Sequence, residues 1–248
     1  MKTSIHLAAL AALLPSTIAQ TTNTDACSPL KLVYSRATGE PGLTSPTAGY
    51  GAAGYALLTN LTALVPGASG HALDYPAGFL PTSSNIGTTA LLTYLSSAST
   101  RCPSQRYALG GHSQGGNVTY HAIPRIPAEI LSKIVAVTMF GSPKCQPQVV
   151  GRCNSYCYVG DFACDGPGGG KFGNGGTESL NLRVKREEME MAVNCEKLLA
   201  LKPQGEKSRF ASGFGGAHMS YAADGVYVQA AACYIKQQFE KSKAAGAR

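Results

Sequence analysis

The stretch Arg106-Tyr107-Ala108-Leu109-Gly110-Gly111-His112-Ser113-Gln114-Gly115 decides the fold. Its first half is a short apolar run typical of a buried strand, and a helical pattern begins at Gln114. Residues 111–115 match G-x-S-x-G, in which a tight strand-to-helix turn raises a serine hydroxyl above the edge of a sheet. The small flanking residues are needed because the turn is strained and the backbones pack closely. The stretch therefore predicts a nucleophilic serine, Ser113.

Outward from this turn, short apolar runs alternate with longer helical patterns, each bounded by Gly, Pro or Ser. Such alternation is typical of βα units in a parallel sheet. We expect strands at 30–34, 72–75, 106–110, 134–140 and 155–159, and helices at 50–64, 85–99, 114–133 and 224–241. The fold class is therefore α/β, with a central, mostly parallel five-stranded sheet.

Composition limits the function classes. The 248 residues are 44% hydrophobic and 14% charged, which suits one sizeable core and excludes a disordered polymer. The net charge is +7, yet no block of five like charges occurs, so we expect no nucleic-acid partner.

The N-terminus has the pattern of a secretory signal peptide over residues 1–19. A basic Lys2 precedes an apolar run over residues 5–14, and small residues follow. The run is too short for a membrane span, so we expect no stable membrane anchor. The prediction is a secreted, extracellular, single-domain protein over residues 20–248, whose eight cysteines mostly form disulfides. Structural zinc is disfavoured because the cysteine cluster lacks a neighbouring histidine and paired C-x-x-C spacing.

Residues 171–212 form a charged insertion. Positions 171–210 hold 14 of the 35 charged residues, and Gly-rich sequence flanks the segment on both sides. It is a solvated helical excursion, a disordered segment or a retained intron translated into protein. Cysteine parity argues mildly against the intron, because removal of Cys195 would leave seven cysteines.

A nucleophilic serine needs a base and a carboxylate that orients the base. Outside the signal peptide, the turn and its helix, the histidines are His71 and His218. The chain order Ser, acid, His of such hydrolases selects His218 and leaves His71 at a strand start. Asp161 is the candidate acid, with Asp165 as the alternative; a turn-stabilising role for Asp161 stays open.

The tetrahedral intermediate of acyl transfer needs hydrogen-bond donors for its oxyanion. The backbone N–H of Gln114 supplies one. The loop after the first strand, residues 35–40, supplies the second, where Thr38 offers both an N–H and a hydroxyl. A plain strand-to-helix turn is the alternative role for this loop.

With these residues in place, the chain resembles the fungal cutinase and acetylxylan esterase family of small secreted serine esterases. The resemblance is carried by Cys27, residues 34–40, Cys102-Pro103, residues 111–115, the stretch Cys157 to Cys164 around Gly160-Asp161, and residues 218–221. It implies a three-layer α/β/α sandwich, a minimal α/β-hydrolase fold with no large lid. His112 stands where family members often carry Tyr.

The resemblance also implies roles and bridges. Ser113, Asp161 and His218 would form the triad, with Thr38 and Gln114 as the oxyanion hole. Cys27 would pair with Cys102 and Cys157 with Cys164. The other four cysteines pair most simply as 145 with 153 and 195 with 233, but the sequence leaves this open.

The expected activity is hydrolysis of carboxylic esters through an acyl-enzyme by a monomer, without cofactor or metal. The substrate is a plant polymer ester of the cutin type or a small acyl ester, favoured by an apolar substrate rim of Phe79, Leu80, Phe214 and Met219. Residues 74–77 resemble the acetylxylan esterase branch, so acetylated xylan is the alternative. A second alternative is a catalytically silent secreted binder or elicitor with the same fold. A serine protease is least favoured.

Two sequons begin at Asn60 and Asn117 and are candidate glycan acceptors. Asn117 lies one turn into the helix after the serine. We expect it to be buried and its sequon unused.

Overall fold

The computed structural model describes residues 26–142, 145–165, 195–200, 207 and 216–246. The signal peptide predicted at 1–19 lies outside the described residues, as do most of the 171–212 segment and Phe214.

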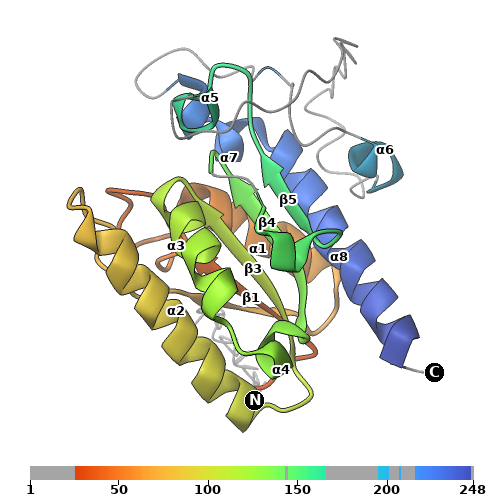
Figure 1. The fold of residues 1–248 in the computed structure, drawn as a ribbon. Helices are drawn as coiled ribbons and strands as arrows, with labels where there is room; N and C mark the ends of the chain where they lie inside the picture. The colour runs from red at the N-terminus through yellow and green to blue at the C-terminus, as the bar shows by residue number, and fades with distance from the viewer. Residues whose placement is uncertain (1–25, 143–144, 166–194, 201–206, 208–215, 247–248) are drawn as a thin grey trace, which may run out of the picture.

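The sheet has five parallel strands in the order β2-β1-β3-β4-β5 (Figure 1). They are β1 (Leu30–Ser35), β2 (Ser69–Ala72), β3 (Arg106–His112), β4 (Ile134–Phe140) and β5 (Cys153–Tyr156). The strand order reverses between β1 and β3, so the crevice beyond their carboxyl ends is where ligands bind in open α/β sheets. The end of β3 carries Ser113, and the loop after β1 carries Thr38.

Helices cover both faces of the sheet (Figure 1). The first face packs against α1 (Gly51–Leu64) and α8 (Val226–Gly246), and the second against α2 (Thr82–Arg101) and α3 (Gln114–Ala122). Alternate side chains of β1 feed the two cores: Leu32 joins the first and Val33 the second. The three-layer sandwich is confirmed. No helix among the described residues is long and apolar enough to cross a membrane.

The shorter elements join these layers. They are η1 (Ile123–Arg125), α4 (Ala128–Leu131), η2 (Pro147–Val149), α5 (Phe162–Asp165), α6 (Cys195–Leu199), η4 (Gly216–Met219) and α7 (Tyr221–Asp224).

Two predicted helices are interrupted. The helix expected at 114–133 ends at Ala122 and continues only as η1 and α4, because Pro124 and Pro127 cannot donate the hydrogen bonds of a continuous helix. The helix expected at 224–241 is split into α7 and α8 by Gly225, whose φ of 76° is left-handed.

Two predicted strands are displaced by a few residues. The second strand ends at Ala72, because the Arg36 guanidinium donates hydrogen bonds to the carbonyl oxygens of Leu73 and Tyr75, at 3.3 and 2.5 Å. The fifth ends at Tyr156, and shortly beyond it the backbone N–H of Tyr158 donates to the Tyr221 hydroxyl at 3.2 Å. These backbone groups bond to side chains instead of a strand ladder.

The structure contains four disulfides: Cys27–Cys102, Cys145–Cys153, Cys157–Cys164 and Cys195–Cys233. The last one joins α6, which belongs to the charged segment, to the buried α8. Cys195, inside that segment, is therefore tied covalently to the core.

Both sequon asparagines lie within helices. Asn60 in α1 is half-buried and donates its side-chain N–H to the Ala56 carbonyl at 2.8 Å. Asn117 in α3 is also half-buried rather than fully buried, because the sheet-facing side of α3 is formed by Gly115 and Thr119, which contact β1 and β3.

Candidate active site

Ser113 occupies a strained turn between β3 and α3. Its φ of 54° and ψ of −117° are unusual for a residue other than glycine. Glycines permit the turn: a Cβ on Gly111 would lie 2.3 Å from the carbonyl carbon of Gly115, and one on Gly115 would lie 1.9 Å from the Ser35 carbonyl oxygen. The turn holds the serine at the carboxyl edge of the sheet, with its backbone N–H bonded to the Phe140 carbonyl at 2.9 Å.

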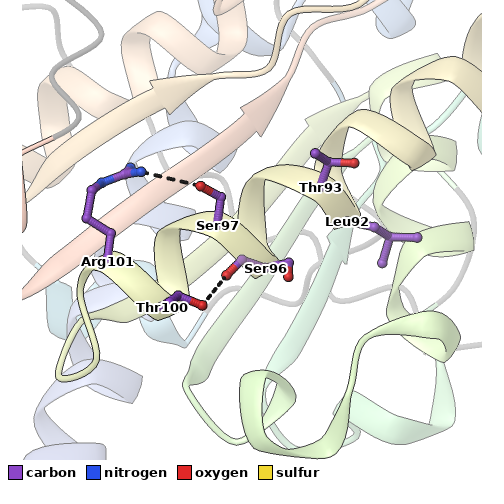
Figure 2. Close-up of a pocket in the computed structure, with 6 residues that line it drawn as sticks. All are labelled: Leu92, Thr93, Ser96, Ser97, Thr100 and Arg101. Carbon is purple, nitrogen blue, oxygen red and sulfur yellow. Dashed lines mark hydrogen bonds between the residues drawn. The ribbon is translucent and has the colours of Figure 1, made fainter.

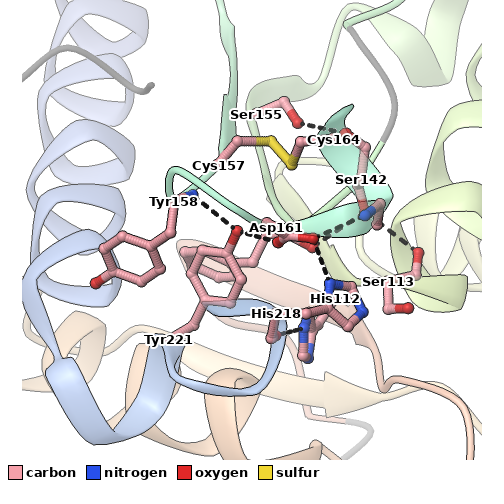
Figure 3. The surroundings of a disulfide bond; sticks show 12 residues. His112, Ser113, Ser142, Ser155, Cys157, Tyr158, Asp161, Cys164, His218 and Tyr221 are labelled. Carbon is pink, nitrogen blue, oxygen red and sulfur yellow. Dashed lines mark hydrogen bonds and ion pairs between the residues drawn. A yellow bond between two sulfur atoms is a disulfide. The ribbon is translucent and has the colours of Figure 1, made fainter. Parts of the chain in front are cut away.

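Asp161 and His218 form a buried pair at the same edge. The imidazole Nδ1 lies 2.7 Å from the carboxylate Oδ1, and the two residues are 0% and 4% exposed. Asp161 follows β5 and His218 belongs to η4, so 57 residues of sequence separate them. Figure 3 shows the pair beside the Cys157–Cys164 bridge, inside whose loop Asp161 lies.

Further donors hold the Asp161 carboxylate. The backbone N–H of Ala163 donates to Oδ1 at 2.9 Å, and the Tyr221 hydroxyl donates to Oδ2 at 2.5 Å. Burial alone would raise the pKa of Asp161, but the hydrogen bonds from His218 and Tyr221 outweigh it and lower the pKa below its usual value. The carboxylate is thus ionised at neutral pH. Asp165, the alternative acid, is the last residue of α5.

The end of β4 connects this pair to the serine turn. A Cβ on Gly141 would lie 2.6 Å from Asp161 Oδ2 and 2.7 Å from His218 Nδ1, so the strand end contacts the pair directly. The next residue, Ser142, donates its hydroxyl to the Ser113 carbonyl at 3.2 Å. Ser113, Asp161 and His218 therefore gather around one strand end, as Figure 3 shows.

His112 is a site residue that the sequence interpretation set aside because it lies inside the turn. Its Nε2 lies 2.8 Å from the backbone carbonyl oxygen of His218. Burial lowers the pKa of His112 to about 4, and the neighbouring His218 lowers it too. The ring is therefore neutral at neutral pH, and its Nε2 must carry the proton to donate to a carbonyl. The signal in the sequence was that His112 stands where family members often carry Tyr.

Thr38 and Gln114 are both tied to the loop that precedes α2. The N–H of Gly39, beside Thr38, donates to the Ala77 carbonyl at 2.8 Å. The Gln114 side chain donates to the Gly78 carbonyl at 2.8 Å and accepts from the Ser83 hydroxyl at 2.9 Å. The two segments proposed to supply oxyanion donors are thus both hydrogen-bonded to adjacent residues of one loop, Ala77 and Gly78.

Large apolar side chains are exposed near these residues. Phe79, Leu80 and Met219 are 88%, 71% and 51% exposed, and Met219 directly follows His218. Phe162 is 64% exposed, and its ring lies 4.3 Å from the His218 ring, centroid to centroid. Sequence reasoning missed Phe162, although its position next to Asp161 was a usable signal.

Two open hollows of about 810 Å³ each lie along α2. Figure 2 shows the first, lined by Leu92, Thr93, Ser96, Ser97, Thr100 and Arg101. The second includes His71, which lies within β2 rather than at its start and stacks on Tyr94 with centroids 3.6 Å apart. Ser113 and the Asp161–His218 pair line neither hollow.

The fold and the site together define a class. A serine on a strained strand-to-helix turn, with a buried Asp–His pair at the carboxyl edge of a parallel sheet, is the arrangement of an α/β hydrolase.

The chain belongs to the cutinase family, whose model matches residues 26–172. The matched range includes Ser113 and Asp161 and ends before His218. The chain is 32% identical to a cutinase of Botryotinia fuckeliana over 179 residues, covering 67% of this chain and 86% of that protein. It is 30% identical to a cutinase of Blumeria hordei over 165 residues, covering 63% and 69%.

A solved acetylxylan esterase structure shares the fold, with a TM-score of 0.54 at 16% identity, over 86% of this chain and 100% of that chain. Members of the cutinase family are carboxylic ester hydrolases, and this chain is a serine esterase of that family.

Proposed function

We propose that this protein hydrolyses cutin-type polyesters or short acyl esters through a Ser113–His218–Asp161 triad. The observation that carries the proposal is the buried 2.7 Å contact between Asp161 and His218 at the strand end that also binds the Ser113 turn. We propose further that it is secreted, because four disulfides suit an oxidising compartment, and that it acts as a monomer.

The proposed reaction begins when Ser113 Oγ attacks the ester carbonyl carbon and His218 Nε2 takes the hydroxyl proton. The oxyanion of the tetrahedral intermediate accepts hydrogen bonds from the backbone N–H of Gln114 and from Thr38. The intermediate collapses, the C–O bond to the alcohol breaks, and His218 returns the proton to the departing alkoxide. Water then attacks the acyl carbon and gives its proton to His218. The bond between the acyl carbon and Ser113 Oγ breaks, His218 returns the proton to Oγ, and the acid is released.

Asp161 holds the base in the required tautomer. Its Oδ1 accepts the Nδ1–H of His218, which leaves the Nε2 lone pair for the serine proton. The low pKa of the carboxylate keeps it anionic when the imidazolium forms, so the pair stabilises that charge.

The exposed apolar side chains support a substrate with aliphatic acyl groups. Phe79, Leu80 and Met219 would pack against methylene groups, and each such group removed from water contributes about 0.8 kcal/mol. In the stretch that resembles acetylxylan esterases, the Tyr75 hydroxyl donates to the Arg36 carbonyl at 2.5 Å. Tyr75 therefore supports the loop before Thr38 instead of facing substrate. Acetylated xylan remains the alternative to test.

The test is intact-mass spectrometry of the secreted protein before and after treatment with a phosphonate that traps activated serines. One adduct is expected, mapped to Ser113 and absent from a Ser113→Ala variant. Folded but unlabelled protein would refute the triad and favour the silent binder. Initial rates on a series of acyl esters, a polyester film and acetylated xylan then separate the substrate classes: faster release from xylan than from polyester would refute the cutin-type assignment.

A further inference from the structure

Tyr221 contacts the one carboxylate oxygen of Asp161 that His218 does not use. Oδ1 accepts from the His218 imidazole at 2.7 Å and from the Ala163 N–H at 2.9 Å, while Oδ2 accepts from the Tyr221 hydroxyl at 2.5 Å. Asp161 and Tyr221 are both 0% exposed. The carboxylate is therefore fixed at both oxygens and cannot rotate about its Cβ–Cγ bond without losing a charge-assisted hydrogen bond.

The Tyr221 hydroxyl is itself held in place. It accepts the backbone N–H of Tyr158 at 3.2 Å, so its own proton is directed at Asp161. Its ring stacks on the Tyr158 ring at 4.8 Å between centroids and meets the rings of His112 and Phe140 at 5.4 and 5.5 Å. This aromatic packing keeps the donor aimed at the carboxylate before any substrate binds.

We propose that Tyr221 is a positioning residue of the esterase reaction: its hydroxyl fixes the Asp161 carboxylate and thereby sets the orientation of His218. The inference rests on the proposed triad. This role of Tyr221 is distinct from packing, because the hydroxyl donates its hydrogen bond to the carboxylate that orients the base.

The direction of the pH effect follows from the groups around the carboxylate. His218 on η4, His112 on β3, Tyr158 after β5 and Tyr221 on α7 face Asp161 or its partners. Burial and the adjacent carboxylate raise the pKa of Tyr221 far above its usual value, so it stays a donor at every working pH. Its hydrogen bond lowers the pKa of Asp161. Removal of that donor makes the carboxylate more basic, which favours a proton on the Asp161–His218 pair.

The principal variant is Tyr221→Phe, assayed on a soluble short-chain ester between about pH 5 and pH 9. We expect kcat to fall by about tenfold to a hundredfold, as for a lost hydrogen bond to a charged group. KM should stay within about twofold, because the buried Tyr221 does not reach the substrate. The acid limb of kcat/KM, which reports the pair as a coupled unit, should move to higher pH.

The matched control is Tyr34→Phe. Tyr34 is 0% exposed, and its hydroxyl has no hydrogen-bond partner among the described residues, so this variant removes a buried hydroxyl away from Asp161. Its kcat and acid limb should match those of the wild type. An equal loss in both variants would mean that the loss does not depend on the hydrogen bond to Asp161, and would overturn the proposal.

A double variant tests the route of the effect. If Tyr221 acts through the carboxylate, Asp161→Asn with Tyr221→Phe should be no slower than Asp161→Asn alone. Additive losses would overturn the proposal. Should Tyr221→Phe not fold, 3-fluorotyrosine at position 221 keeps the shape of the ring and makes the phenol a stronger donor, so the acid limb should move to lower pH. An unmoved limb would refute the role.

Phosphonate labelling distinguishes a failure of the proposed triad from a failure of the role of Tyr221. Wild-type protein that takes no adduct on Ser113 would overturn the triad and the role of Tyr221 together. A labelled wild type with an unaffected, folded Tyr221→Phe variant would overturn the role of Tyr221 alone.

Discussion

Two short disulfide loops provide a matched test of what braces Asp161. Cys157–Cys164 and Cys145–Cys153 span 7 and 8 residues of sequence, so they close loops of nearly equal length. In the chain-entropy treatment, loops this short stabilise the folded state by about 2.5 kcal/mol each. Replacement of either cysteine pair by alanine should therefore cost about the same stability.

Activity should distinguish the two loops. Only the loop closed by Cys157–Cys164 contains Asp161, and this bridge lies beside the carboxylate in Figure 3. Without the bridge, the carboxylate keeps its hydrogen bonds but the loop that carries it gains freedom. Because a displacement of about 1 Å costs about a hundredfold in rate, we expect kcat to fall by tenfold or more, to about that limit. The Cys145→Ala/Cys153→Ala variant should keep wild-type kcat.

The assay pairs urea unfolding with ester hydrolysis, measured where both variants are fully folded. Equal loss of stability with a selective loss of kcat in the Cys157→Ala/Cys164→Ala variant is the expected outcome. Equal kcat in the two variants would show that the other contacts suffice to hold Asp161, and would refute a positioning role for the Cys157–Cys164 bridge.

The remaining predictions concern the base, the acid and the rim. His112→Phe removes the donor to the His218 carbonyl and should lower kcat by about tenfold, whereas His112→Gln, which keeps an N–H donor, should lose less in the same ester assay. Since the pKa of His112 is lowered to about 4 in the fold, stability should fall as pH drops from about 6.5 to about 4, by roughly 3 kcal/mol. In His112→Phe, the melting temperature should depend less on pH over that range. Asp161→Asn should lower kcat by about 10⁴-fold on a soluble ester, because the amide permits the wrong imidazole tautomer; a loss below tenfold would contradict the orienting role. Phe79→Ser should slow hydrolysis of a polyester film but leave the rate on a soluble acetate ester and the melting temperature unchanged, since Phe79 is almost fully exposed.

The site could be predicted from sequence to the extent that its features are local. The turn at Ser113 depends on glycines beside the serine, and those are visible in the sequence. The breaks at Pro124 and Gly225 were equally visible, but the prediction ran one helix across each of these positions. The displaced end of β2 was not visible, because it depends on the Arg36 side chain reaching carbonyl groups 37 and 39 residues away.

The sequence by itself determined the class of the protein: the turn motif, the alternating strands and helices, and the order of serine, acid and base along the chain. Tertiary structure decided which groups meet. Asp161 and His218 are brought together across 57 residues, His112 reaches the His218 carbonyl across 106, and Tyr221 reaches Asp161 across 60. These contacts exist because parallel strands deliver their carboxyl ends to one edge, while hydrogen-bond partners so far apart leave no periodic trace in the sequence.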